Sequence, residues 1–342
     1  EQIIMGLLYT ILFISLVILF TVNLIWIFVN LGFWITHGIQ SLLDSKNFLE
    51  NIYYSTYLKW ILLFDFLWLI SLFSFAIKRK NFRTDSTLDY LYVDKVDNPT
   101  MSVVIPTYNE ESAISTLVSG FLNQKNVNDV IVVDNNSTDN TVEIAKKLGA
   151  KVITKNKNMG FAHSCVIGLK ESLSLDGDIV VLVEGDGSYI PEDINKMIPY
   201  IDNCDMVLGT RALQILSEQN TQLSMTHIWG NYILAKLIQI KFFSLLHMGS
   251  VSLTDVGCLY RIIRKDSLKK IIETFTDSTT QKIKPNFEFT LFMTIESLTH
   301  NLRIIEVPVS FKKRVGISKI GSEKKLKAIK IGFIFLWYIL RS

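Results

Sequence analysis

The chain has 342 residues, of which 49% are hydrophobic and 20% are charged, and its formal net charge is +3. The near balance of 35 basic and 32 acidic residues gives no basis for a nucleic-acid partner, and three widely separated cysteines exclude a disulfide-rich scaffold. A chain of this length can form one or two domains with their own cores.

The N-terminal part contains two long apolar runs, at residues 3–35 and 57–77. About 20 apolar residues span a bilayer, so we expect a transmembrane hairpin over residues 1–80; a buried soluble helix is the alternative for the second run. Four basic residues follow that run directly, and they are Lys78, Arg79, Lys80 and Arg83. Because basic flanks stay on the cytosolic side of a membrane, everything after this run is expected to face the cytosol. Residues 81–100 are expected to be a linker.

The middle of the chain alternates short β-branched runs with stretches of helical spacing. Strands are expected at residues 102–106, 130–133, 151–154, 179–183 and 206–208. Helices are expected at residues 110–122, 141–148, 161–173 and 192–201. This alternation predicts an α/β domain with a mainly parallel sheet and helices on both faces. Neither a dinucleotide-binding nor a phosphate-loop glycine motif is present, which disfavours NAD enzymes and P-loop NTPases.

Polar residues follow the ends of these expected strands, and ligands collect at the carboxyl ends of parallel strands. They are Tyr108, Glu110, Asp134, Asn158, Gly160, Glu184, Asp186 and Arg211. Their coincidence at one edge of the sheet predicts a ligand site there.

The turn Glu184-Gly185-Asp186 places two carboxylates on either side of a small residue. Oxygen ligands on a tight turn suit Mg²⁺ or Mn²⁺, although acidic pairs on turns are common without any metal. Asp134 is open to two interpretations, as a turn residue or as an acceptor for a base or ribose. Arg211 is the basic residue best placed to grip a phosphate.

The other basic residues of the second half are mostly expected to face solvent or anionic lipid: Arg261, Arg264, Lys312, Lys313, Arg314 and Lys319. The amphipathic stretch 231–248 is expected to be a core or membrane-surface helix. Residues 321–342 combine lysines with a short apolar run, which predicts a helix lying in the membrane interface.

Taken together and in order, these motifs resemble family 2 glycosyltransferases of the GT-A fold, and in particular the polyprenyl-phosphate sugar synthases of the dolichol-phosphate mannose synthase type. The resemblance covers residues 100 to 320. It is carried by VIPTYNE at 104–110, VVDNNSTD at 132–139, NKNMGFA at 156–162, EGD at 184–186, TDVGC at 254–258 and RVGISK at 314–319. It implies a GT-A domain over residues 101–320.

The resemblance implies roles for individual residues. The nucleotide would be held by Pro106, Tyr108, Glu110 and Asp134, with Asn158 and Gly160 from the third motif. The metal and diphosphate would bind Glu184, Asp186 and Ser188. Arg211 would contact the acceptor phosphate, and Asp255 would orient the acceptor. The donor diphosphate would be bound by Arg314, Ser318 and Lys319. The implied catalytic residues are Asp186, Asp255 and Arg211.

The apolar runs and their basic flank predict an integral membrane protein with a cytosolic domain. The resemblance implies that this domain moves a sugar, with inversion, from a UDP-sugar or GDP-mannose to a polyprenyl phosphate. Two alternatives remain open: transfer to a lipid-linked glycan or other membrane acceptor, and an inactive membrane scaffold. A processive polysaccharide synthase is less favoured because the QxxRW motif does not occur. Two spans are too few for a transporter.

Overall fold

The computed structural model describes residues 96–218, 221, 225–243, 251–285, 288–315 and 325–342, with six isolated positions before residue 71. The chain divides into two units, Glu1–Arg79 and Lys80–Ser342. The expected spans at 3–35 and 57–77 lie outside the described residues, apart from those isolated positions. Within the described residues, every helix is too short or too polar to cross a membrane.

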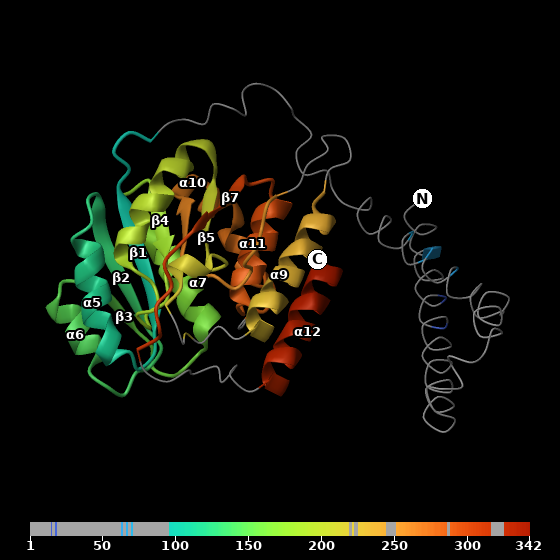
Figure 1. Ribbon diagram of the computed structural model, residues 1–342. Coiled ribbons are helices and arrows are strands. Elements are labelled where there is room, and N and C mark those ends of the chain that lie inside the picture. Colours follow the sequence, from blue (N-terminus) through green and yellow to red (C-terminus); the bar gives the residue numbers. More distant parts are fainter. Residues whose placement is uncertain are drawn as a thin grey trace. The chain divides into compact units, whose positions relative to one another are not determined.

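A seven-stranded mixed sheet forms the centre of the second unit (Figure 1). Its strands are β1 (Met101–Thr107), β2 (Val127–Asp134), β3 (Lys151–Thr154), β4 (Ile179–Leu182), β5 (Met206–Thr210), β6 (Arg261–Arg264) and β7 (Ile304–Pro308). Their order is β3-β2-β1-β4-β6-β5-β7. Only β6 runs against its neighbours among these strands, so the expectation of a mainly parallel sheet is confirmed.

The helices are α5 (Glu111–Leu122), α6 (Thr141–Lys147), α7 (Phe161–Leu173), α8 (Ile194–Met197), α9 (Met225–Lys241), α10 (Lys265–Ile271), α11 (Phe289–Thr299) and α12 (Lys325–Arg341). Short 3₁₀ turns are η2 (Pro191–Asp193), η3 (Ile198–Asn203), η4 (Gln214–Leu216) and η5 (Ile272–Phe275). The single helix expected at 192–201 is wrong, because η2, α8 and η3 share that stretch. Pro199 lies in it and lacks the amide hydrogen that a continuous helix requires.

Alternating side chains of the strands divide the core into two layers. Val103 and Ile105 of β1 point to one face, and Val104 between them points to the other. Residues of α5 and α8 cover the first face, and residues of α7, α9, α11 and α12 cover the second. Because both faces are covered, the strands can be apolar throughout, as β4 is.

The C-terminal helix α12 packs beside α9 (Figure 1). Its Phe335 and Ile339 are buried in the core layer that α9 and α11 also line. The buried ammonium of Lys241, at the end of α9, donates to the Ile339 carbonyl and, over 2.9 Å, to the Ser342 hydroxyl. The outward side of α12 exposes Phe333 and Trp337. One side of α12 is therefore core, and the other is an exposed apolar surface.

Arg261 is an exception to the expectation that most of the later basic residues face solvent or lipid, because its side chain is fully buried at the start of β6. Its guanidinium donates to the carbonyls of Thr290 at 3.0 Å and Cys258 at 2.6 Å. Burial lowers the pKa of Arg261 to about 10. Arg261 thereby ties α11 to the loop that enters β6.

Candidate active site

Most of the implied site residues that the structure describes lie at or just after the carboxyl ends of β1 to β5. Pro106 lies in β1, opposite Val133 of β2. Tyr108 and Glu110 follow β1, Asp134 ends β2, Glu184 and Asp186 follow β4, and Arg211 follows β5. Parallel strands bring these positions to one edge of the sheet.

The loops after β1 and β2 are locked together by hydrogen bonds. The backbone amide of Asn109 donates to Ser137 Oγ at 2.8 Å, and the amide of Thr138 donates to Asn109 Oδ1 at 2.8 Å. The buried carboxylate of Asp134 accepts the amides of Asn136 and Ser137 at 3.1 Å. Asp134 therefore shapes its own turn, as the turn interpretation predicts, while it lies at the edge where ligands collect.

A second polar group joins the end of β2 to the loop before α7. Asn135 Nδ2 donates to Asn158 Oδ1 at 2.7 Å, and the Gly160 amide donates to the same oxygen at 3.0 Å. Lys155 Nζ donates to Asn135 Oδ1 at 2.9 Å and to Ser164 Oγ at 2.6 Å. Burial lowers the pKa of Lys155 to about 8. Asn158 thus organises this loop, and Lys155 is a polar member of the site that the sequence interpretation missed.

Arg314 covers the acidic turn. Its Nε and Nη2 atoms both lie 2.5 Å from Asp186 Oδ2, and Nη2 lies 3.7 Å from Glu184 Oε2. Burial alone would lower the pKa of Arg314, but the carboxylates of Asp186, Glu184 and Glu110 together raise it. The turn, Glu110 and Arg314 therefore share one electrostatic environment, in which Asp186 is buried and Glu184 partly exposed.

The donor set of the acidic turn fits a divalent cation. Burial and the nearby charge of Asp186 raise the pKa of Glu184 to about 8, so a cation bound beside it would favour its ionised form. Mg²⁺ is usually held by one or two carboxylates, with the remaining positions filled by water and substrate phosphates. No group of three or more His, Cys, Asp or Glu side chains placed to hold a metal occurs in the described part of the chain. Glu184 and Asp186 supply two carboxylates, which is the number that Mg²⁺ commonly takes from a protein.

The acidic turn packs closely against the end of β1. A Cβ atom on Gly185 would lie 2.8 Å from Thr107 Cγ2 and 3.0 Å from the Pro106 carbonyl oxygen. We therefore expect Gly185→Ala to displace both carboxylates and to lower the activity of this site by up to about 10²-fold. Gly332→Ala in α12, where a Cβ would meet nothing within 4 Å, is the control. Kinetics of both variants test this; full activity of Gly185→Ala would contradict it.

The segment 311–315 lies along the acidic turn and reaches the neighbouring cluster. The Lys312 amide donates to the Ser188 carbonyl at 2.8 Å, and the Val315 amide donates to the Asp186 carbonyl at 3.1 Å. At its other end, the Phe311 ring lies 5.1 Å from the guanidinium carbon of Arg211. The segment therefore links the acidic turn to Arg211.

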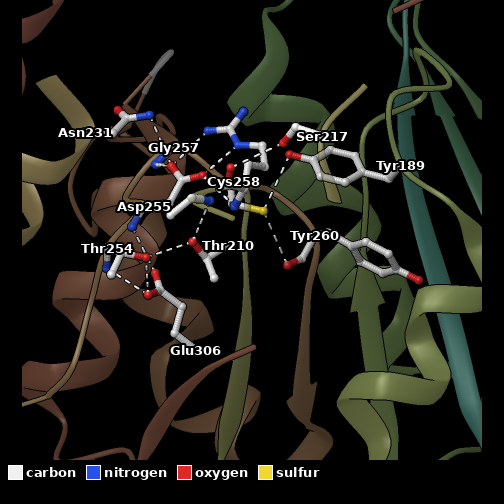
Figure 2. A network of polar contacts seen from close by, with 12 residues as sticks. Tyr189, Thr210, Ser217, Asn231, Thr254, Asp255, Gly257, Cys258, Tyr260 and Glu306 are labelled. Atoms are coloured by element: carbon white, nitrogen blue, oxygen red, sulfur yellow. Dashed lines mark hydrogen bonds and ion pairs between the residues drawn. The ribbon is translucent and has the colours of Figure 1, made fainter. Parts of the chain in front are cut away.

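Arg211 forms a two-pronged ion pair with Asp255, which Figure 2 labels. Nε lies 2.6 Å from Oδ2, and Nη2 lies 2.9 Å from Oδ1. The carboxylate also accepts Asn231 Nδ2 at 3.1 Å and the Gly257 amide at 3.0 Å. Burial alone would raise the pKa of Asp255, but the charge and hydrogen bonds of Arg211 lower it below its ordinary value. A carboxylate so fully engaged orients Arg211 and is a poor general base.

Two further members of this network could not be recognised in the sequence. Asn231 comes from α9, and Glu306 from β7 accepts hydrogen bonds from Thr254 and Asp255 (Figure 2). Both lie far along the chain from Arg211, and neither belongs to a polar cluster in the sequence. Ser318 and Lys319, which the resemblance assigned to the donor diphosphate, lie outside the described residues.

Known proteins resemble this chain in sequence and in fold. The model of glycosyl transferase family 2 matches residues 102–272, half of the chain. Undecaprenyl-phosphate mannosyltransferase of Micrococcus luteus is 26% identical over 250 residues, which are 70% of this chain and 96% of that relative. Dolichol-phosphate mannosyltransferase of Pyrococcus furiosus is 30% identical over 261 residues, 69% of this chain and 71% of the relative. The crystal structure of a mycobacterial protein aligns with a TM-score of 0.50 at 18% identity, over 71% of this chain and 75% of that one, which bears on the fold alone.

Proposed function

Because the chain belongs to glycosyl transferase family 2, we propose that it moves a sugar from a nucleotide-sugar donor to a polyprenyl phosphate. The observation that carries this proposal is the pairing of two charged centres at one edge of the sheet. The acidic turn with Arg314 suits a donor diphosphate, and the Arg211–Asp255 pair suits an acceptor phosphate. The two relatives named above act on undecaprenyl phosphate and dolichol phosphate, which supports this choice of acceptor.

In the proposed reaction, an oxygen of the acceptor phosphate bonds to the anomeric carbon while the bond from that carbon to the donor diphosphate breaks, with inversion. A phosphate is anionic at pH 7, so its attack needs no strong general base, which agrees with the engaged state of Asp255. Asp134 and Glu110, with Pro106, Tyr108, Asn158 and Gly160, would hold the nucleotide. Arg314 would pass from Asp186 to the diphosphate.

A divalent metal, either Mg²⁺ or Mn²⁺, would be held by Glu184 and Asp186, with Ser188 beside them. When bound, it would neutralise charge on the leaving diphosphate. Since Arg314 contacts the same carboxylates, its departure would leave their charge for the metal.

We further propose that the enzyme is an integral membrane protein with its catalytic domain in the cytosol. The support is the apolar runs at 3–35 and 57–77 with their basic flank, and the exposed aromatic side chains Phe333 and Trp337 of α12. The acceptor would then be presented at the membrane surface.

The test is to incubate membranes containing the protein with polyprenyl phosphate and a panel of labelled UDP- and GDP-sugars, and to extract the lipid product. We expect one donor to label the polyprenyl phosphate, EDTA to abolish labelling, and Mn²⁺ or Mg²⁺ to restore it. Labelling only of a preformed lipid-linked glycan would replace this proposal by the alternative acceptor. Absence of labelled product from every donor would overturn it.

A further inference from the structure

We propose that Glu306 is a positioning residue for the acceptor side of the site. Its carboxylate fixes the loop 254–257 and, through Asp255, sets the orientation of Arg211. The inference rests on the proposed function in one respect only, which is that Arg211 is taken to meet the acceptor phosphate.

The carboxylate of Glu306 receives three hydrogen bonds from two consecutive residues of the loop. Oε2 accepts the Thr254 amide at 2.7 Å and the Thr254 hydroxyl at 2.7 Å. Oε1 accepts the Asp255 amide at 3.0 Å (Figure 2). Both carboxylate oxygens of Glu306 therefore accept hydrogen bonds. Oε1 binds the backbone of Asp255, which orients Arg211, and Oε2 binds the residue before it, Thr254.

The hydroxyls connect Glu306 to the end of β5 in a defined direction. Thr254 Oγ1 donates to Glu306, so in its 2.8 Å contact with Thr210 Oγ1 it is the acceptor. Thr210 Oγ1 in turn accepts the Ala212 amide at 3.2 Å. The Ala212 amide thus donates to Thr210, Thr210 to Thr254, and Thr254 to Glu306. The last group in this series must be a hydrogen-bond acceptor. A glutamate supplies one, and an amide in the same place would satisfy it only in part.

The position of Glu306 in the sheet explains why it can act on Arg211. Glu306 pairs with Leu208 in the parallel β5–β7 ladder, and Arg211 lies three residues beyond Leu208. The loop 254–257 contacts the end of β5, where Thr254 Oγ1 lies 2.8 Å from Thr210 Oγ1 and Asp255 meets Arg211 over 2.6 Å. Burial, opposed by the hydrogen bonds from Thr254, raises the pKa of Glu306 to about 7.

The same strand pair offers a matched control at its opposite end. Asp205, just before β5, accepts Arg303 Nε at 2.7 Å and Ser267 Oγ at 2.9 Å, and Arg303 lies just before β7. Both carboxylates tie β5 and β7 to neighbouring segments, but only Glu306 does so beside Arg211. Asp205→Asn therefore measures how the loss of a structural carboxylate in these two strands changes stability and the acceptor KM when Arg211 is not involved.

The experiment compares Glu306→Gln, Glu306→Ala and Asp205→Asn in the full-length protein. We expect Glu306→Gln to raise the KM for polyprenyl phosphate about tenfold and leave the KM for the nucleotide sugar unchanged, and Glu306→Ala to raise the acceptor KM further. Asp205→Asn should lower Tm without changing the acceptor KM. An unchanged acceptor KM in both Glu306 variants, or an equal rise in both KM values, would overturn the inference.

Hydrogen exchange separates this inference from the proposed function, because it needs no substrate. In Glu306→Gln, a peptide covering residues 251–258 should exchange faster, while peptides from β1 and β2 keep the wild-type rate. Unchanged exchange in that peptide overturns the positioning role whichever acceptor the enzyme uses. Absence of polyprenyl-phosphate labelling by the wild-type protein counts only against the proposed acceptor.

Discussion

Replacing Asp186 by asparagine is expected to lower sugar transfer by about 10³-fold or more. Asn keeps the shape of the side chain but removes the charge that faces Arg314 at 2.5 Å and that would hold the metal. Stabilising charge on a leaving group is commonly the largest electrostatic contribution to such a reaction. Initial rates of labelled product, and calorimetry with a nucleoside diphosphate and Mn²⁺, measure the loss.

Asp178→Asn is the matched control, since Asp178 lies at the amino end of β4 and Asp186 follows its carboxyl end. The carboxylate of Asp178 accepts the amide and hydroxyl of Thr100 at 2.9 Å, away from the site. We expect near-normal rates in this variant. Metal-dependent transfer by Asp186→Asn at more than about a tenth of the wild-type rate would remove Asp186 from the proposed chemistry.

Replacing Asp255 by alanine is expected to damage both folding and transfer. The guanidinium of Arg211 is almost fully buried, and the substitution removes its ion-pair partner. Breaking a buried ion pair in this way typically lowers the free energy of unfolding by about 3–5 kcal/mol. Urea unfolding followed by circular dichroism measures this cost. The acceptor KM should rise in any protein that still folds, because Arg211 then lacks the carboxylate that orients it.

Asp255→Asn separates positioning from base catalysis. The amide retains one oxygen for Arg211 and Gly257 and removes basicity, so a positioning role predicts partial activity with a raised acceptor KM. A base role predicts loss of kcat with little change in KM. The second pattern would contradict the engaged state of Asp255, which receives hydrogen bonds from Arg211, Asn231 and Gly257.

The parallel part of the fold could be predicted from the sequence because its signals are local. β3 and α7 have the predicted boundaries, and the other four predicted strands differ from the observed ones by a few residues. A short, continuous run of apolar β-branched residues is typical of a strand that is buried on both faces, so these strands can be recognised from the sequence. The acidic turn was recognisable for the same reason, since it directly follows such a run.

The other part of the sheet could not be predicted, because its signals are not local. β6 is only four residues long and has an arginine at each end, a pattern that indicates a solvent-facing turn. Burial of Arg261 depends on carbonyls from α11 and the preceding loop, which no sequence window contains. Glu306 meets Asp255 across 51 residues of chain, so its role is visible only in three dimensions.

The reversed direction of β6 has a consequence for how such enzymes can diversify. β6 enters the sheet from the edge where the ligand would bind, so the chain between β5 and β6, which includes α9 and Asp255, begins and ends at that edge. This excursion can change in length and composition while β1, β2 and β4 keep their places. Under the proposed roles, changes in this segment would alter the acceptor side of the site and leave the donor side in place.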